Sequence, residues 1–492
     1  MTAGSTLAQH LIRNASRAPE RNAFLTREGD MQYGEFVARI GWTASRLRAR
    51  GIEPGERILL CAPNSPEVAI AYFAIHWLGA VAVPVEPGIP EASLRWIFAD
   101  CDARLAIVEG RETDLPEIVS LGAITAGSGP GPLRDPCCEP NDDADILYTT
   151  GTTGTRKGVV LTHGNILSAA VNITEFLRNG ENDIEVVPLP LSHSFGLGRL
   201  RCMALNGNCV VLERNLSNPA GFLKQLVDLR ATGLALVPSG FEILRRLTRD
   251  CIGTASTHLR YIEIGSMPMR DDTRGWLMRM LPDTRICHHY GLTEASRAAF
   301  TEYHSDADRP GTIGRAAPNV EITIRDEMLA TVPARKTGEI VVRGAMVMRE
   351  YWKRPDLTAA ALSESGLRTG DHGYLDEDGY LYLLGREDDL INVGGLKVIP
   401  EEVEEKIRQY PGVRDAVCIG IPDPLGLSGQ CVKAFIVADT PVSVAGLKAW
   451  LRGQLEEYKI PGVIEHCAEI PRTSSGKPQR YKLRELDGAN GS

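Results

Sequence analysis

The sequence contains 492 residues, of which 43% are hydrophobic and 24% are charged, and its formal net charge is -9. This composition is typical of a soluble globular protein and excludes a disordered or collagen-like chain. The acidic balance argues against a general nucleic-acid or anionic-membrane binder, because such proteins carry a surplus of Lys and Arg.

The length of the chain predicts roughly three folding units, at about 150 residues per domain. The N-terminal residues lack a long apolar stretch, and no apolar run is long enough to cross a membrane, so we predict neither a signal peptide nor a membrane span. The 11 cysteines are scattered singly apart from Cys137 and Cys138, and no CxxC pair is present. This pattern favours reduced thiols and a cytoplasmic protein.

Residues 33–108 alternate between helical and extended patterns. The segments 33–51 and 65–79 predict helices, and the short apolar runs at 57–63, 80–85 and 103–108 predict strands. Alternation of this kind is typical of βα units that build a largely parallel sheet.

A second set of apolar runs begins after a connection rich in Gly, Pro and Ser at 122–143. These predicted strands occupy residues 144–150, 184–189, 208–213, 233–238, 260–265 and 285–291. Together with the preceding region they predict an α/β fold with doubly wound mixed sheets.

The pattern changes after about Pro310. Short strands separated by turns predict a small antiparallel β-barrel or sheet over residues 310–385. A compact α+β module follows, with helices at 400–412 and 442–461 around strands at 414–422 and 430–437. We therefore predict an N-terminal domain of residues 1–387 and a C-terminal domain of residues 388–492.

The loop TTGTTGTRKG at residues 149–158 predicts a phosphate site. Backbone N–H groups and hydroxyls of a loop rich in Gly and Thr can surround phosphate oxygens, and Lys157 adds a positive charge. The loop is not a Walker A motif, GxxxxGK[ST], because Arg156 precedes Lys157 and Gly158 follows it. It therefore favours a polyphosphate that is used for chemistry other than simple NTPase cleavage.

Four further motifs follow the loop: HHYGLTEAS at 288–296, GLRTGDHGY at 366–374, GREDDLINVGG at 385–395 and PRTSSGKPQR at 471–480. In this order they resemble the motifs of the adenylate-forming superfamily, which includes acyl-CoA synthetases, aryl-CoA ligases, stand-alone adenylation enzymes and firefly-type luciferases. The resemblance covers nearly the whole chain. It implies ATP-dependent adenylation of a small or medium carboxylic acid, followed by transfer of the acyl group to the CoA thiol, with ATP, Mg²⁺ and CoA required.

The resemblance also implies roles for single residues. The ATP phosphates are expected at Thr149, Thr150, Gly151, Thr152, Thr153, Gly154 and Lys157. Adenine and ribose are expected at Gly265, Ser266, Tyr290, Asp371 and Arg386. Thr293 and Glu294 should meet phosphate and Mg²⁺, with Glu294 as the metal ligand, and Lys477 should stabilise charge that grows in the transition state.

The C-terminal domain is implied to be mobile, with Asp388 at its hinge. After rotation Lys477 leaves the site, and Gly394 and Gly395 bring a close-fitting backbone to the thiol tunnel. One site can then serve two half-reactions. The chain departs from the usual family pattern at Arg156, where Pro is commonest, and at Pro478, where a branched apolar residue is usual.

The acyl pocket is expected to be lined by His193, Phe195, Gly196, Ser239, Gly240 and Gly291. Small residues at these positions favour an aromatic or medium-sized acid, and the Asp that would grip an amino group is not evident. Three arginines, Arg199, Arg201 and Arg297, follow two of the pocket segments. They either sit on helix surfaces or give the pocket a positive potential for a second anion.

Several alternatives stay open at this stage. The acceptor is either CoA, a carrier-protein thiol or an amine, the last in an amide- or diazo-forming ligase, and the oligomeric state is undecided. An inert homologue that binds nucleotide without turnover is disfavoured, because Lys157, Glu294 and Lys477 are present. A hydrolase is disfavoured because SHS at 192–194 lacks the GxSxG frame, and a zinc site at His288-His289 is disfavoured because adjacent residues of a strand point to opposite faces.

Overall fold

The computed structural model describes residues 4–27, 29–127, 135–150, 156–214, 216–386, 389, 391–393, 396–424, 430–473 and 476–490. Within these residues the chain forms two compact units. The first consists of Met1–Thr149, Arg156–Ile322 and Val341–Leu367, and the second includes Thr323–Ile340 and Arg368–Ser492. The units are defined by internal contacts, so the domain boundary predicted at 387/388 stays a prediction.

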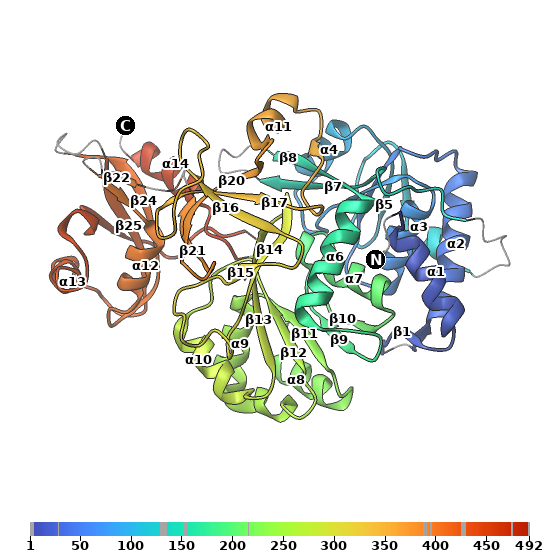
Figure 1. The fold of residues 1–492 in the computed structure, drawn as a ribbon, viewed down its shortest axis with the longest axis horizontal. Coiled ribbons are helices and arrows are strands. Elements are labelled where there is room, and N and C mark those ends of the chain that lie inside the picture. The colour runs from blue at the N-terminus through green and yellow to red at the C-terminus, as the bar shows by residue number, and fades with distance from the viewer. Residues whose placement is uncertain are drawn as a thin grey trace. The chain divides into compact units, whose positions relative to one another are not determined.

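The larger sheet has nine strands, of which the central six run parallel. Their apolar sequences match this position, because strands of a parallel sheet are buried on both faces. In spatial order the strands are β15 (Arg315–Ala316), β14 (Ala295–Glu302), β13 (Arg285–Leu292), β12 (Tyr261–Ile264), β11 (Gly233–Leu236), β9 (Ile184–Val187), β10 (Cys209–Leu212), β1 (Asn22–Phe24) and β2 (Met31–Gln32). Figure 1 shows α8 (Pro219–Asp228), α9 (Pro238–Thr248) and α10 (Asp271–Met280) gathered around β11, β12 and β13.

The second sheet of the first unit has seven strands. In spatial order they are β18 (Glu350–Tyr351), β8 (Arg156–Thr162), β7 (Asp143–Thr150), β4 (Val81–Pro84), β3 (Arg57–Cys61), β5 (Ala103–Val108) and β6 (Ile118–Ser120). The remaining helices of this unit are α1 (Leu7–Arg17), α2 (Tyr33–Ala49), α3 (Pro66–Trp77), α4 (Glu91–Asp100), α5 (Leu121–Thr125), α6 (His163–Leu177), α7 (Ser194–Asn206) and α11 (Pro355–Ala361). These two sheets confirm the predicted α/β class.

A third sheet occupies the region where a small barrel or sheet was predicted. Its order is β16 (Glu321–Arg325), β17 (Gly338–Arg343), β20 (Gly366–Leu375) and β19 (Leu362–Ser363), and β21 (Leu381–Arg386) also pairs with β20. Among the described residues no pairing joins the outer strands, so this is an open sheet rather than a closed barrel.

The C-terminal residues form the predicted small α+β module. Its strands are β22 (Ile391–Val393), β23 (Leu396–Val398), β24 (Val413–Pro422), β25 (Gln430–Ala438) and β26 (Val463–His466), and its helices are α12 (Pro400–Arg408), α13 (Val444–Leu451) and α14 (Arg480–Asn490). The helix predicted at 442–461 is shorter than expected. It ends at Leu451, and Gly453 follows in a turn in which its N–H donates to the carbonyl of Trp450 at 3.1 Å.

Helix α7 lies between the two large sheets and is buried along most of its length. Arg199 binds carboxylates of the nine-stranded sheet: it pairs with Glu185, and its Nη1 lies 3.0 Å from Glu263 Oε2. Arg201 instead binds the seven-stranded sheet, with Nη2 2.6 Å from Asp145 Oδ2. Residues two apart on a helix point in nearly opposite directions, so one helix supplies a cation to each sheet. Both arginines are at most 1% exposed, so neither sits on a helix surface.

A second buried polar cluster surrounds Asp145. Its carboxylate accepts a hydrogen bond from Tyr72 at 3.0 Å and lies 3.1 Å from His76 Nε2. The ring of His76 packs edge-on against His163, with ring centroids 4.9 Å apart. Neither ring nitrogen of His163 has a hydrogen-bond partner among the described residues, and burial lowers the pKa of this imidazole to about 3. His163 is therefore a neutral packing group at neutral pH.

Replacement of His163 by Phe is expected to make the fold less sensitive to acid. The unfolded imidazole binds a proton below its ordinary pKa of 6.5 and the folded one does so only near 3, so protonation favours unfolding throughout this window. As far as His163 is concerned, the free energy of unfolding has its full value above pH 6.5 and falls by about 1.4 kcal/mol for each pH unit below it. Urea unfolding at pH 7 and pH 5 should show the wild-type protein losing about 2 kcal/mol more than His163→Phe. The exposed control His466→Phe should follow the wild type, and an identical pH slope for His163→Phe would contradict the assignment.

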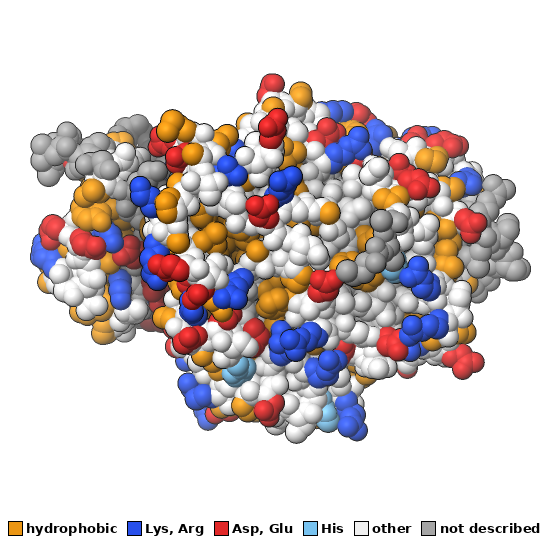
Figure 2. Space-filling view, in the orientation of Figure 1, with side chains coloured by type: hydrophobic (Ala, Val, Ile, Leu, Met, Phe, Trp, Pro, Cys, Tyr) orange, Lys and Arg blue, Asp and Glu red, His pale blue; other side chains and the backbone are white. Residues whose placement is uncertain are grey.

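The described surface carries both signs of charge. On the face shown in Figure 2, Lys and Arg side chains are mixed with Asp and Glu side chains. None of the described helices has the length and apolar character that crossing a bilayer requires.

Candidate active site

Half of the residues predicted to bind nucleotide or acid gather at one edge of the nine-stranded sheet. Strands β9, β11, β12 and β13 are parallel neighbours, so their carboxyl ends meet at the same edge. In open α/β sheets this edge is where ligands bind. The predicted residues at or just beyond these four strand ends are His193, Phe195, Gly196, Ser239, Gly240, Gly265, Ser266, Tyr290 and Gly291.

Three positions at this edge require glycine, because neighbouring atoms lie too close to leave room for a Cβ atom. A Cβ atom on Gly265 would lie 2.0 Å from the His289 ring, and one on Gly291 would lie 2.5 Å from the backbone nitrogen of Arg297. Gly196 is equally confined, since its Cβ would meet the Pro190 carbonyl oxygen at 2.3 Å. Any larger residue would displace these segments, because such distances are far inside van der Waals contact.

Phe195 and Arg297 join two of the pocket segments. Arg297 Nη2 donates to the Phe195 carbonyl at 3.0 Å, and its guanidinium lies 5.0 Å from the centroid of the Phe195 ring. Its Nε lies 2.9 Å from Glu263 Oε1, and its Nη1 donates to the Ser194 carbonyl and to Ser296 Oγ. Arg297 is 2% exposed. Its donors are thus used inside the protein, which makes it a structural cation and contradicts a position on a helix surface.

Glu263 is the anion that both neighbouring arginines share. Burial opposes its ionisation, but the charges of Arg297 and Arg199 outweigh burial and hold the pKa of this carboxyl well below its usual range. His289 Nδ1 also lies 2.9 Å from Glu263 Oε1. Burial lowers the pKa of His289, so the imidazole adds no third positive charge to the cluster.

Lys157 and Glu294 come together from different sheets. Lys157 lies on β8 of the seven-stranded sheet, and Glu294 lies with Thr293 in the turn between β13 and β14. The Lys157 Nζ atom is 3.4 Å from Glu294 Oε1, and Glu294 is 6% exposed. Tyr351 bonds to both of them: Lys157 Nζ donates to its hydroxyl at 2.7 Å, and the hydroxyl donates to Glu294 Oε1 at 2.8 Å.

Thr149 adds a hydroxyl at the end of β7. Its Oγ1 is buried and has no hydrogen-bond partner among the described residues. Because buried polar groups normally have such a partner, this hydroxyl is suited to bind a polar ligand. Gly151, Thr152, Thr153, Gly154, Asp388, Gly394 and Gly395 lie outside the described residues, as do the side chains of Thr150 and Arg386. The predictions for these residues therefore stay predictions.

The residues around Glu294 fit a magnesium ion that is shared with a substrate. Mg²⁺ prefers oxygen donors and is usually held by one or two carboxylates together with substrate phosphates and water. No group of three or more His, Cys, Asp or Glu side chains in the described part of the chain could form a metal cage. Glu294, whose carboxylate lies 3.4 Å from Lys157 Nζ, is compatible with the shared arrangement.

Asp371 and Arg386 belong to the second unit. They are direct Cα partners in the antiparallel pair of β20 and β21, so they occupy neighbouring positions on the sheet. Asp371 is 8% exposed, and its backbone N–H donates to Thr369 Oγ1 at 3.1 Å. This register is compatible with the shared ribose role predicted for the two residues.

Lys477, also in the second unit, lies in a tight loop. Thr473 N–H donates to the Lys477 carbonyl at 2.8 Å, and Lys477 N–H donates back to Thr473 Oγ1 at 3.0 Å. Arg472 anchors the loop, with Nη2 2.6 Å from Asp415 Oδ2 on β24. The side chain of Lys477 is exposed. A braced backbone with an exposed ammonium group suits a lysine that reaches toward a substrate.

Two of these site residues were missed in the sequence. Tyr351 lies in EYWKRPD, where no spacing singles it out. Glu263 had a usable signal, because it is an acidic residue inside the otherwise apolar strand YIEI, and a buried carboxylate needs a cation nearby. The same signal is present at Glu185 in IEVV.

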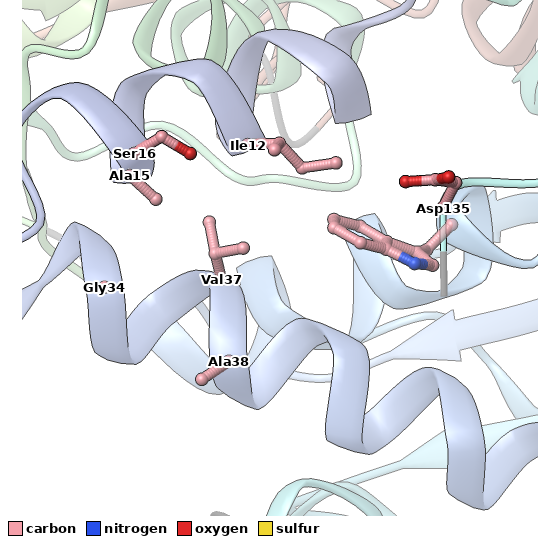
Figure 3. A pocket seen from close by; sticks show the side chains of 8 residues that line it. Ile12, Ala15, Ser16, Gly34, Val37, Ala38 and Asp135 are labelled. Carbon is pink, nitrogen blue, oxygen red and sulfur yellow. The ribbon is translucent and has the colours of Figure 1, made fainter. Parts of the chain in front are cut away.

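A small pocket among the described residues lies away from the predicted site. It is lined by Ile12, Ala15, Ser16, Gly34, Val37, Ala38, Trp77 and Asp135. Figure 3 shows side chains of α1 and α2 pointing toward each other across it. None of these residues is a predicted site residue, so the pocket carries no functional assignment.

Comparison with known proteins identifies the family. A model described as "AMP-binding enzyme" matches residues 11–352, and one described as "AMP-binding enzyme C-terminal domain" matches residues 402–477. Feruloyl-CoA synthase of Amycolatopsis sp is 31% identical, with 97% of this chain and 98% of that protein covered. Sulfoacetate–CoA ligase of Cupriavidus necator is 32% identical, with 97% of each chain covered.

A solved structure agrees with these relatives. The o-succinylbenzoate CoA synthetase of Bacillus subtilis, in complex with its acyl-adenylate intermediate, superimposes with a TM-score of 0.90 at 26% identity, covering 98% of this chain and 99% of that one. The agreement extends over both family models and over nearly the full length. The chain therefore belongs to the AMP-binding enzyme family, the adenylate-forming superfamily that its motifs resemble.

Proposed function

We propose that the protein is an ATP- and Mg²⁺-dependent acid–CoA ligase. The observation that carries this proposal is the convergence of Lys157, Tyr351 and Glu294 from two sheets, in a chain that belongs to the AMP-binding family. The relatives that match along their whole length include CoA ligases. A structure of the Bacillus subtilis synthetase contains ATP and a magnesium ion.

The first half-reaction turns a carboxylate into an acyl donor. A carboxylate oxygen attacks the α-phosphorus of ATP, the bond to the bridging oxygen breaks, and pyrophosphate leaves with the electron pair. Lys157 and Thr149 would hold phosphate oxygens, Glu294 would hold Mg²⁺, which neutralises phosphate charge, and Lys477 would stabilise the charge on the α-phosphate. Such transfer depends mainly on positioning and electrostatic stabilisation, so the site needs no general-acid pair.

The second half-reaction transfers the acyl group to a thiol. The CoA sulfur attacks the acyl carbon, and AMP leaves with the former carboxylate oxygen. In this proposal residues 388–492 rotate about Asp388, which withdraws Lys477 and brings Gly394 and Gly395 to the tunnel. Tyr290 stacks on adenine, and Asp371 and Arg386 hold the ribose in both steps.

The acid that binds is proposed to carry no second charge. Arg199, Arg201 and Arg297 are the cations nearest the pocket segments in the sequence, and each is engaged by buried carboxylates or carbonyls. Sulfoacetate and o-succinylbenzoate, named for two relatives, carry a second anionic group, whereas ferulate does not. Because these three arginines are already paired inside the protein, they do not offer a charge to a second anionic group. This favours an aromatic or medium-sized monocarboxylate as the substrate.

Matched acid pairs test this substrate class. Pyrophosphate release should be faster with cinnamate than with 4-carboxycinnamate, which differs by one carboxylate. An unpaired buried charge costs at least about 2 kcal/mol, which corresponds to a discrimination of about 30-fold in kcat/KM. Preference for the diacid would contradict the neutral pocket, and no pyrophosphate release with any acid of a broad panel would contradict adenylation itself.

The acceptor is tested separately. CoA, a phosphopantetheinylated carrier protein and simple amines are offered in parallel, and the products are identified by mass. A thioester with CoA is expected, and a product formed only with the carrier protein or an amine would replace CoA as the acceptor.

All eleven cysteines are free thiols, which supports the proposal of a reducing, cytoplasmic location.

A further inference from the structure

Residues 347–352 connect the two large sheets beside Lys157 and Glu294. At one end of this connecting segment, Val347 bridges to Ala295 and the Met348 N–H donates to the Glu294 carbonyl at 2.8 Å. At the other end, β18 pairs with β8, and Arg349 and Trp352 donate to carbonyls of that strand at 3.0 and 2.8 Å. The backbone of one short segment thus fixes the turn that carries Glu294 and the strand that carries Lys157.

The side chain of Tyr351 also links the two elements, because it contacts the side chains of both Lys157 and Glu294. It is 5% exposed, and Lys157 Nζ lies 4.1 Å from the centroid of its ring. The hydroxyl accepts from Lys157, a predicted phosphate-binding residue, and donates to Glu294, the predicted metal ligand. The opposite order is excluded, because an ammonium group has no acceptor and a carboxylate has no proton to donate.

This geometry fixes the relative position of the two charges. Lys157 Nζ and Glu294 Oε1 form an ion pair at 3.4 Å, and the Tyr351 hydroxyl bonds to both atoms from one side. The ammonium group has three protons and gives one to Tyr351, which leaves donors for phosphate oxygens. The carboxylate keeps its second oxygen for a metal ion.

We propose that Tyr351 is a positioning residue that keeps Lys157 and Glu294 aligned for MgATP. It acts through these two side chains, and neither the sequence motifs nor the family comparison assigns it a role. The inference rests on the proposed function, since it supposes that the two residues serve phosphate and Mg²⁺. Its consequence is specific: loss of the hydroxyl weakens the use of MgATP and leaves the handling of acid and thiol intact.

The test compares Tyr351→Phe with Tyr33→Phe. Tyr33 is 1% exposed, and its hydroxyl donates to backbone carbonyls at 2.8 and 3.1 Å, so the control also removes a buried hydroxyl, but away from this segment. Acid-dependent pyrophosphate release is measured while ATP, Mg²⁺ and acid are each varied. For Tyr351→Phe we expect kcat/KM for MgATP to fall about 10- to 100-fold, in line with a lost hydrogen bond to a charged group, and the half-saturating Mg²⁺ concentration to rise. The KM for acid, and thioester formation from supplied acyl-adenylate, should be unchanged.

Equilibrium titration with MgATP adds a measurement that needs no turnover. Tyr351→Phe should bind about tenfold more weakly than the wild type, and Tyr33→Phe should bind as the wild type does. Equal MgATP affinity of Tyr351→Phe and wild type would overturn the inference, as would an equal loss of all parameters in both variants. A wild type that binds MgATP but activates no acid would contradict the proposed function alone, because the binding comparison would still decide the role of Tyr351.

Discussion

Replacement of Lys477 by Ala is expected to reduce acyl-adenylate formation by about 10²- to 10³-fold, the usual effect of removing one group that stabilises developing charge. The two half-reactions should separate in this variant. Thioester formation from supplied acyl-adenylate should keep most of its rate, because the proposed rotation has withdrawn Lys477 by then. The reduction is measured as acid-dependent pyrophosphate release, and the second step as AMP release from synthetic acyl-adenylate and CoA.

The structure explains why this substitution should spare the fold. The Lys477 side chain is exposed, and the loop is braced by backbone contacts with Thr473 and by the Arg472–Asp415 pair. Lys482→Ala is a matched control, since it removes an exposed lysine from α14 five residues further along the chain. Equal losses in both half-reactions of Lys477→Ala, without a change in stability, would contradict the two-position scheme.

The sequence predicted those parts of the site that depend on local pattern. The apolar runs predicted the strands, and the family resemblance implied the roles of Gly265, Tyr290 and Gly291. These residues gather at one edge because parallel strands align their carboxyl ends. The open third sheet and the short helix α13 were less predictable. The first depends on which strands pair and the second on where the helix ends. The ends of helices and strands are the features that a sequence pattern predicts least accurately.

Long-range contacts explain what the sequence did not reveal. Tyr351 is 194 residues from Lys157 and 57 from Glu294, so no spacing rule relates them. For Arg199 and Arg201 the sequence left two alternatives open, a helix surface or a positive potential in the pocket. They are buried because α7 lies between two sheets, each of which contributes a carboxylate. The sequence does not show this position of the helix.

Glu263 offers the largest expected effect on stability. Replacement by Gln keeps the shape of the side chain but leaves Arg199 and Arg297 with one buried carboxylate, Glu185, in place of two. Removal of one partner from a buried ion pair costs about 3–5 kcal/mol, because the remaining charge is uncompensated. Urea unfolding should show this loss at pH 7. Asp228→Asn, which removes the exposed Lys224–Asp228 pair, should leave the midpoint at its wild-type value.

The pH dependence of the same variant gives an independent check. The pKa of Glu263 is held below its ordinary value of 4.5 in the folded protein, so its ionised form stabilises the fold above that value. This contribution is lost as the pH falls below 4.5 and the unfolded carboxyl takes up a proton first. Between pH 7 and pH 3.5 the wild type should therefore lose more stability than Glu263→Gln, and the two curves should converge. Parallel curves would mean that the charge of Glu263 does not hold the two arginines in place, and that packing alone supports this edge of the sheet.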